Sequence, residues 1–167
     1  MRFLPLVAPG GSALDVAAGA GRHSRLLLAH GLRVTAVDRD PDQQPDAPGL
    51  AKIRVDLEDG RPWPLGHSRF DLVVVTNYLH RPILPVIIAA VAPGGLLLYE
   101  TFASGNERFG RPSNPDFLLR PGELAAAVAG RLEVLDYEQL ETPPPRPAMI
   151  QRIAARAGSP RPARGRV

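Results

Sequence analysis

A turn of small residues joins an apolar segment to a helical segment near the start of the chain, and this turn limits the fold more than any other feature. Residues 13–21 read ALDVAAGAG, which is apolar except for Asp15 and ends in the small residues that a tight turn needs. Residues 22–30 then carry three consecutive leucines and are followed by Gly31, a typical residue after a helix end. Residues 33–38 (RVTAVD) are apolar and β-branched, as in a strand. Strand, turn, helix and strand in this order predict two parallel strands with a crossover helix.

The same alternation continues to the end of the chain. Phe70–Thr76 is a nearly continuous apolar run, typical of a strand that a parallel sheet buries on both faces. Further strands are expected at 51–57, 96–101, 132–140 and 149–155, helices at 82–92 and 123–129, and loops at 39–50, 58–69 and 104–121. Only a proline-rich turn separates the last two strands, which predicts an antiparallel hairpin. The fold class is therefore α/β: a three-layer Rossmann-like sandwich with a mostly parallel seven-stranded sheet and one antiparallel strand near the C-terminus.

The charge of the chain is concentrated at its C-terminal end. The 167 residues include 20 Lys+Arg and 17 Asp+Glu, with a pI near 9.9. Three of the basic residues lie in the last ten, so residues 1–157 carry 17 basic and 17 acidic side chains and are neutral. We therefore expect a single domain over residues 1–157 and a flexible basic tail over 158–167. Nucleic acid is disfavoured as a partner, because the domain itself carries no excess of basic charge.

Composition also excludes several classes of protein. The chain has no cysteine, which rules out a disulfide scaffold and any zinc or iron–sulfur site with cysteine ligands. The apolar run at 86–92 is far shorter than the roughly 18 residues that a spanning helix needs. The histidines show no metal-ligand spacing, so no metal is expected. These observations predict a cytoplasmic protein without a membrane segment.

The small-residue turn and Asp38 together predict a site for a cofactor that contains a nucleoside. Small residues allow a ligand to approach the backbone, and an acid at the end of the second strand can accept hydrogen bonds from ribose hydroxyls. A dinucleotide fingerprint would need a third small residue, Gly or Ala, where this chain has Ser24. Asp15 would also repel a pyrophosphate, whereas it tolerates the cationic sulfonium and ammonium groups of S-adenosylmethionine. The sequence therefore favours S-adenosylmethionine over NAD, with helix–strand packing alone as the remaining alternative.

The segments ALDVAAGAGRHS (13–24) and Val34–Asp38 resemble the first two motifs of class I S-adenosylmethionine-dependent methyltransferases. The pattern resembled is D-x-G-x-G-x-G, and Ala17 stands where its first glycine is expected. The run GRHS at 21–24 and residues 99–124 are similar to the small tellurite-resistance and thiopurine-type branch. The resemblance covers about residues 12–155. It also implies a helix before the first strand, for which only about ten residues precede that strand here.

The resemblance implies a cofactor site of ten residues. Asp15 is expected to orient the ammonium group, Asp38 to hold the ribose hydroxyls, and Arg39 to cover one face of the adenine. Asp56 and the residue after it match the position that meets the adenine amino group, although a solvated loop acid is an alternative. The full set is Asp15, Ala17, Gly19, Gly21, Arg22, Asp38, Arg39, Asp56, Leu57 and Asn77.

Three residues are candidates for catalysis because they follow strands at the edge where an open α/β sheet binds ligands. His80 is the candidate general base, since an unperturbed imidazole titrates near pH 6.5, or else it is a loop histidine. Arg81 is a candidate anion-binding residue, or else a surface arginine. Glu100 could receive a proton or bind a cationic acceptor, or it could fix the following loop by hydrogen bonding.

Two further residues are expected to bind the acceptor. Tyr78 follows the central strand, and Arg111 lies in the glycine- and proline-rich loop 104–121, whose length suggests a lid.

The sequence leaves three functions open. The first is methyl transfer in line to a small molecule. The second is methylation of RNA or protein with the basic C-terminal end as an anchor, although no Asn-Pro-Pro-Tyr-type motif follows the central strand and aromatic residues are few. The third is a degenerate cofactor-binding or regulatory protein. In that case the short crossovers 39–50 and 58–69 would leave one sheet face thinly covered, open to self-association as a homodimer.

Overall fold

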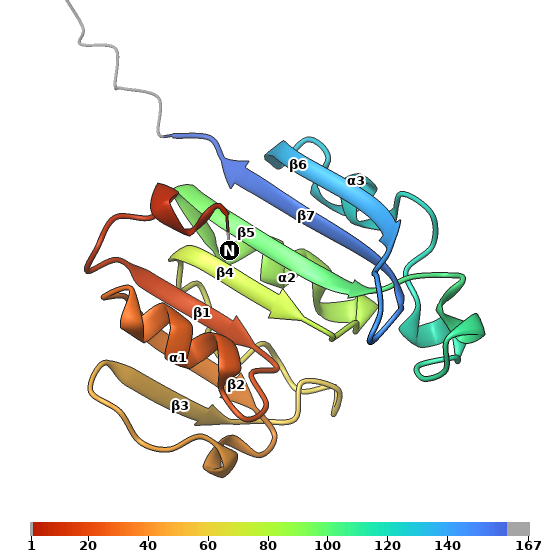
Figure 1. The fold of residues 1–167 in the computed structure, drawn as a ribbon. Helices are drawn as coiled ribbons and strands as arrows, with labels where there is room; N and C mark the ends of the chain where they lie inside the picture. The colour runs from red at the N-terminus through yellow and green to blue at the C-terminus, as the bar shows by residue number, and fades with distance from the viewer. Residues whose placement is uncertain (1, 160–167) are drawn as a thin grey trace, which may run out of the picture.

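Seven strands form one sheet in the computed structural model, which describes residues 2–159 (Figure 1). Their order across the sheet is β3-β2-β1-β4-β5-β7-β6. The strands are β1 Ser12–Val16, β2 Arg33–Asp38, β3 Leu50–Arg54, β4 Phe70–Thr76, β5 Val91–Phe102, β6 Leu132–Glu141 and β7 Met149–Ala157. Strand β7 runs antiparallel to both of its neighbours, and the other paired strands are parallel. The predicted α/β class, with seven strands and one antiparallel strand near the C-terminus, is confirmed.

The helices cover the two faces of the sheet unevenly. Helix α1 (Arg22–Ala29) packs against β1 and β2 on one face, whereas α2 (Leu84–Ala89) and α3 (Glu123–Val128) pack on the opposite face (Figure 1). The strand order reverses between β1 and β4. Right-handed crossovers that run in opposite directions from this point place their helices on opposite faces. Ligands of such sheets bind at the carboxyl ends of the strands beside this reversal.

The alternation of side chains along β4 shows how the core is divided. Leu72 and Val74 pack with Leu27 of α1, while Val73 and Val75 pack with Ile87 of α2. All four β4 residues are buried, as expected for a strand covered on both faces. The long apolar run of β4 is therefore the centre of two separate apolar layers.

The structure differs from the sequence-based expectation between α2 and β5. The helix expected over 82–92 is a 3₁₀ turn at Arg81–Ile83 followed by α2, and Val91–Gly95 already belongs to β5. Phe70 pairs with Val91, and a register shift follows before Leu72 pairs with Leu96. A Cβ at Gly95 would lie 2.9 Å from two backbone oxygens, so the glycines allow a close backbone approach inside the strand. Gly94 and Gly95 are therefore part of an irregularity within β5, and they do not form a turn after the helix.

The N-terminal segment and the crossovers are short. A 3₁₀ turn at Leu4–Leu6 precedes β1, another at Pro41–Gln43 lies between β2 and β3, and β3 ends at Arg54 instead of residue 57. Within residues 2–159 no helix is long and apolar enough to cross a membrane. The basic tail expected from residue 158 onward lies almost wholly outside the described residues. Among the described residues, the N-terminal segment lies over β5 and β7 on the α1 side, whereas β4 also packs against α1 there (Figure 1).

Candidate functional site

The turn between β1 and α1 adopts left-handed backbone at three positions. The φ angles are +53° at Ala17, +52° at Gly19 and +75° at Gly21. A Cβ at Gly19 would meet no atom within 4 Å, whereas one at Gly21 would lie 2.7 Å from the side chain of Gln44. The turn is therefore open toward solvent at Gly19 and closed against the protein at Gly21. Ala17 keeps the left-handed conformation that the first glycine of the motif would adopt more easily.

Asp38 fastens this turn to the end of β2. One carboxylate oxygen accepts a hydrogen bond from the Gly19 N–H at 2.8 Å, and the other accepts from the Asp40 N–H at 2.8 Å. The carboxylate thus fixes the glycine turn beside the position where a ribose would bind.

A cavity of about 320 Å³ lies at the carboxyl ends of β1 to β4. Its lining residues are Ala17, Asp38, Arg39, Val55, Asp56, Leu57, Glu58 and Tyr78. The structure therefore brings together five of the ten residues expected to bind the cofactor. Sequence reasoning missed Glu58, whose backbone N–H donates to the Asp56 carboxylate at 2.9 Å. The sequence did contain one indication of this role, because Glu58 lies only two residues after Asp56.

Tyr78 lines this same cavity, although the sequence suggested that it binds the acceptor. Burial of its hydroxyl, with the nearby Glu58 and Asp56 carboxylates, raises the pKa of Tyr78 well above its usual value. Its backbone oxygen accepts a hydrogen bond from the Tyr99 hydroxyl at 2.8 Å, which holds this segment against β5. Tyr78 therefore belongs to the wall of the first cavity.

Asp15 is buried between β1 and α1 and does not line this cavity. Its side chain is 2% exposed and accepts a hydrogen bond from the Ser24 hydroxyl at 2.6 Å. Burial raises the pKa of Asp15 to about 6, and the hydrogen bonds from Ser24 offset part of that effect. In these surroundings the carboxylate fixes the start of α1 relative to β1.

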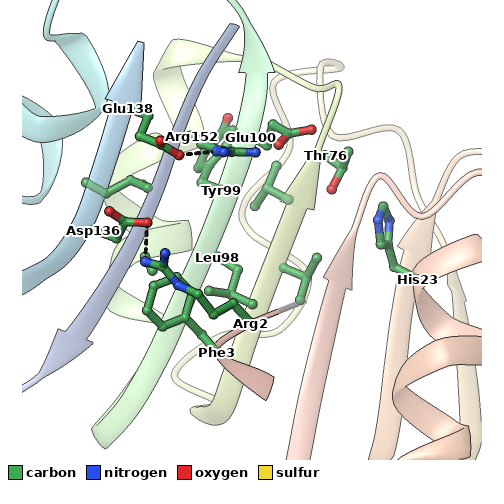
Figure 2. Close-up of a pocket in the computed structure, with 14 residues that line it drawn as sticks. Arg2, Phe3, His23, Thr76, Leu98, Tyr99, Glu100, Asp136, Glu138 and Arg152 are labelled. Carbon is green, nitrogen blue, oxygen red and sulfur yellow. Dashed lines mark hydrogen bonds and ion pairs between the residues drawn. The ribbon is translucent and has the colours of Figure 1, made fainter. Parts of the chain in front are cut away.

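A second cavity, of about 360 Å³, opens on the α1 side of β4, β5 and β7 (Figure 2). The polar and aromatic residues around it are Arg2, Phe3, His23, Thr76, Tyr99, Glu100, Asp136, Glu138 and Arg152. Glu100 is the one member of the three-residue catalytic set that lies here. His23, Glu138 and Arg152 were not expected from the sequence, because they come from segments far apart in the chain.

Arg81 joins the segment after β4 to the start of α3 through an ion pair and hydrogen bonds. Its guanidinium binds both carboxylate oxygens of Glu123 at 2.7 and 2.9 Å, and it donates to the backbone oxygens of Asp116 and Leu118 at 2.7 and 2.9 Å. The hydrogen bond that Arg81 donates to Glu123 is the main cause that raises the pKa of Arg81. These contacts join the segment after β4 to the end of loop 104–121 and the start of α3. The structure thus gives Arg81 a positioning role in place of the expected contact with a ligand.

The remaining expected residues lie outside the two cavities. Half-buried His80 precedes the 3₁₀ turn at Arg81–Ile83, and Arg22 is exposed at the start of α1. Asn77 has a φ of +55°, and its N–H donates to the backbone oxygen of Glu100 at 2.9 Å. Arg111 is exposed in loop 104–121. In the described part of the chain, no group of three histidine or acidic side chains is placed to hold a metal ion.

The residues of the first cavity suit the cofactor that the sequence suggests. Two carboxylates, Asp38 and Asp56, can accept hydrogen bonds from ribose hydroxyls and an adenine amino group, while Gly19 leaves the turn open to a ligand. Left-handed backbone at the turn lets the methionine part approach the chain closely.

Comparison with known families and structures finds methyltransferases. A family model described as a methyltransferase domain matches residues 13–95, which run from β1 into β5. Comparison with curated protein sequences gives no significant match.

Three solved structures with the same fold illustrate how the relatives differ. TehB from Haemophilus influenzae is 18% identical with a TM-score of 0.69; the match covers 93% of this chain and 60% of TehB, so this chain spans less than two thirds of that protein. The 1,6-didemethyltoxoflavin-N1-methyltransferase of Burkholderia thailandensis, solved with S-adenosylhomocysteine, is 21% identical with a TM-score of 0.61, covering 90% and 72% of the two chains. A 16S rRNA (adenine(1408)-N(1))-methyltransferase from Catenulisporales acidiphilia is 18% identical with a TM-score of 0.63, covering 92% and 87%. At these identities the likeness concerns the fold.

Proposed function

We propose that this chain is a class I S-adenosylmethionine-dependent methyltransferase that transfers a methyl group to a small molecule bound in the second cavity. The observation that supports this is the relation between the two cavities. Val16 of β1 pairs with Val75 of β4, and the next residues, Ala17 and Thr76, line the first and second cavity respectively. Neighbouring strands lie about 4.8 Å apart, so these two lining residues stand about one strand spacing from each other at the carboxyl ends of β1 and β4.

The size of the second cavity favours a small acceptor. A volume of about 360 Å³ lies at the lower end of the range of about 300–1,000 Å³ that is typical of small-ligand pockets. Its base is apolar and its rim is charged, a combination that buries an organic body and orients a polar end. A methyltransferase that acts on RNA, like one of the structural relatives, is the alternative, and its acceptor would be a base taken out of the polymer.

When bound, the cofactor supplies a methyl group on an activated sulfonium. The residues of this chain align the acceptor with it and keep water away, which is the main contribution that such an in-line displacement needs. Asp38 and Asp56 hold the nucleoside end through hydrogen bonds. The Tyr99 hydroxyl and the Asn77 N–H fix the segment after β4, which holds Tyr78 of the first cavity close in sequence to Thr76 of the second.

Roles for the remaining expected residues are part of the proposal. Glu100 contacts the acceptor, since its side chain reaches the second cavity. His80 would act as a base only after a local change, because its ring lies outside both cavities. A cytoplasmic location is also proposed, and it is supported by the absence of cysteine from the chain.

Calorimetric titration of the full chain with S-adenosylmethionine, S-adenosylhomocysteine and NAD tests the cofactor site. We expect both S-adenosyl compounds to bind and NAD not to bind. Asp38→Ala should weaken binding by at least about tenfold, which is about 1.4 kcal/mol. Asp42→Ala is the matched control, because Asp42 lies four residues after Asp38 in the 3₁₀ turn that follows β2, pairs with Arg54 and does not line the cavity. NAD binding without S-adenosylmethionine binding would overturn the assignment.

The acceptor class is tested with labelled S-adenosylmethionine and pools of thiols, amines, phenols, oxyanions and RNA. Transfer of label to a small molecule is the expected result. Transfer to RNA alone would refute the small-molecule proposal and leave the methyltransferase assignment standing.

A further inference from the structure

The second cavity is built on two rows of paired residues that cross four strands. One row is Val74–Leu98–Ala154–Asp136 and the other is Thr76–Glu100–Arg152–Glu138, on β4, β5, β7 and β6 in that order. Side chains two residues apart on a strand point to the same face, so both rows face the cavity. The first row is mostly apolar, and the second is polar throughout. The second row begins at Thr76, the last residue of β4, and therefore lies at the edge of the sheet where the cofactor site is.

Ion pairs neutralise most of the charge in this cavity. Arg2 lies 2.6 Å from Asp136, and Arg152 lies 2.5 Å from Glu138 (Figure 2). The hydrogen bond that Arg152 donates to Glu138 is the main cause that raises the pKa of Arg152, and the charge of Glu100 adds to it.

The carboxylate of Glu100 is the one acid among the described residues of this cavity that forms no ion pair. Glu100 is half-buried, and its side chain has no hydrogen bond or ion pair with any residue from 2 to 159. The cavity therefore holds two guanidinium groups and three carboxylates, and Glu100 supplies the excess negative charge. A partly buried carboxylate without a partner is stabilised by a cation.

We propose that this cavity selects acceptors that carry a protonated amine, with Glu100 as the partner of the ammonium group. This inference rests on the proposed function, because it names the substrate class of the same site. The apolar part of the acceptor would lie on Val74, Leu98 and Ala154, and its amine would lie in the polar row beside Thr76. An anionic acceptor is disfavoured because both arginines of the cavity are already paired with acids.

The cavity also contains a group that can take the proton of the amine. An ammonium nitrogen has no free electron pair, so it must lose a proton before it can attack. His23 lines the cavity, and burial, together with the charge of Arg22, lowers the pKa of its imidazole, so His23 can relay a proton but is too weak a base to keep it. The proton would pass through His23 to solvent, the amine nitrogen would form a bond to the methyl carbon, and the electrons of the breaking C–S bond would stay on sulfur. The products are a methylated ammonium and the neutral thioether.

Three probes with the same ring and different ends test the proposal: 2-phenylethylamine, 2-phenylethanol and 3-phenylpropanoate. Each is titrated at neutral pH into the full chain, with and without saturating S-adenosylhomocysteine. We expect the amine to bind at least about tenfold more tightly than the alcohol, which is about 1.4 kcal/mol, and the carboxylate to bind most weakly. Labelled S-adenosylmethionine should then give an N-methylated amine as the product.

Glu100→Gln removes the charge and keeps the shape of the side chain. It should reduce the preference for the amine over the alcohol to less than about threefold, while the affinity for S-adenosylhomocysteine and the melting temperature stay unchanged. Glu133→Gln is the matched control, because Glu133 is an exposed acid of β6 outside the cavity, and it should keep the preference.

The proposal is overturned if the alcohol or the carboxylate binds as tightly as the amine, if no binding of the amine is measurable, or if Glu100→Gln keeps the preference. Failure of the proposed function is a separate result, since it appears as absent binding of S-adenosylhomocysteine. Titration of the three probes in the absence of S-adenosylhomocysteine still measures whether the cavity prefers the amine to the alcohol and the carboxylate.

Discussion

Replacing Gly21 by alanine would add a methyl group at the most crowded point of the turn between β1 and α1. Gly21 has a φ of +75° and caps the N-terminus of α1. The new Cβ would lie 2.7 Å from both Cγ and Oε1 of Gln44, and 2.8 Å from its Cδ. Gln44 is only 2% exposed, so its side chain must move within packed surroundings to make room. The substitution therefore combines backbone strain with overpacking.

The two effects can be estimated separately. Left-handed backbone costs a residue with a Cβ about 1–2 kcal/mol. The reduced freedom of the unfolded chain returns about 0.4–1 kcal/mol, so the net strain is about 1 kcal/mol. Displacing a packed side chain adds about 1–3 kcal/mol. Gly21→Ala should therefore lower the free energy of unfolding by about 2–4 kcal/mol.

A second glycine in the same turn separates these effects. Gly19 has a φ of +52°, but its Cβ would meet no atom within 4 Å, so Gly19→Ala should cost only the strain of about 1 kcal/mol. In a Gln44→Ala background the clash at Gly21 disappears, and Gly21→Ala should also cost about 1 kcal/mol. Urea unfolding followed by circular dichroism measures all four variants. Equal costs for the two glycines in the parent chain, or additive costs for Gly21→Ala and Gln44→Ala, would refute the reasoning.

Three further substitutions test other parts of the site. Asp15→Asn should stabilise the chain at pH 8 by up to about 3 kcal/mol and have little effect at pH 4, as measured by urea unfolding. The pKa of Asp15 rises from 3.8 to about 6 on folding, so between these pH values the folded state binds more protons than the unfolded state. The energetic cost of burying the charged carboxylate therefore develops as pH rises. An equal effect of the substitution at both pH values would contradict this. Arg81→Ala should lower the free energy of unfolding by about 2–4 kcal/mol, because it removes the contacts of Arg81 with Glu123, Asp116 and Leu118. Hydrogen exchange of the backbone amides in residues 115–128 should become faster, while the affinity for S-adenosylhomocysteine stays the same. Unchanged amide exchange would argue against the positioning role of Arg81. Ala17→Gly should add about 0.5–1 kcal/mol of stability by relieving left-handed strain, and a loss of stability in urea would count against that strain.

Local patterns were sufficient to predict the cofactor side of the fold. The apolar runs that form β2 and β4 have in the structure the same bounds that the sequence indicates, because buried strands of a parallel sheet are continuous in hydrophobicity. Asp38 ends β2, and Gly19 lies in the turn after β1. Since these strands are parallel neighbours, the two residues meet at one edge, where they form a hydrogen bond. Their proximity therefore follows from the order of the elements alone.

Other features depend on contacts that no local pattern contains. Arg81 meets Glu123, 42 residues later in the chain, and only the packing of α3 beside the segment after β4 brings them together. The segment Val91–Gly95 has the composition of a helix end followed by a turn, but pairing with Phe70 makes it part of β5. In both cases tertiary contacts override the local signal.

The second cavity illustrates a signal that the sequence does carry once the sheet order is known. On the face that points to this cavity, β5 changes from Leu96 and Leu98 to Glu100 toward its carboxyl end, and β4 changes from Val74 to Thr76. A strand that packs only under a helix has no reason to place a carboxylate there, since an unpaired buried charge is costly. The change from apolar to polar therefore marks the point on each strand where the core ends and a ligand surface begins. Because both changes fall in one row of paired residues at the carboxyl end of β4, they mark the surface where we propose that the acceptor binds.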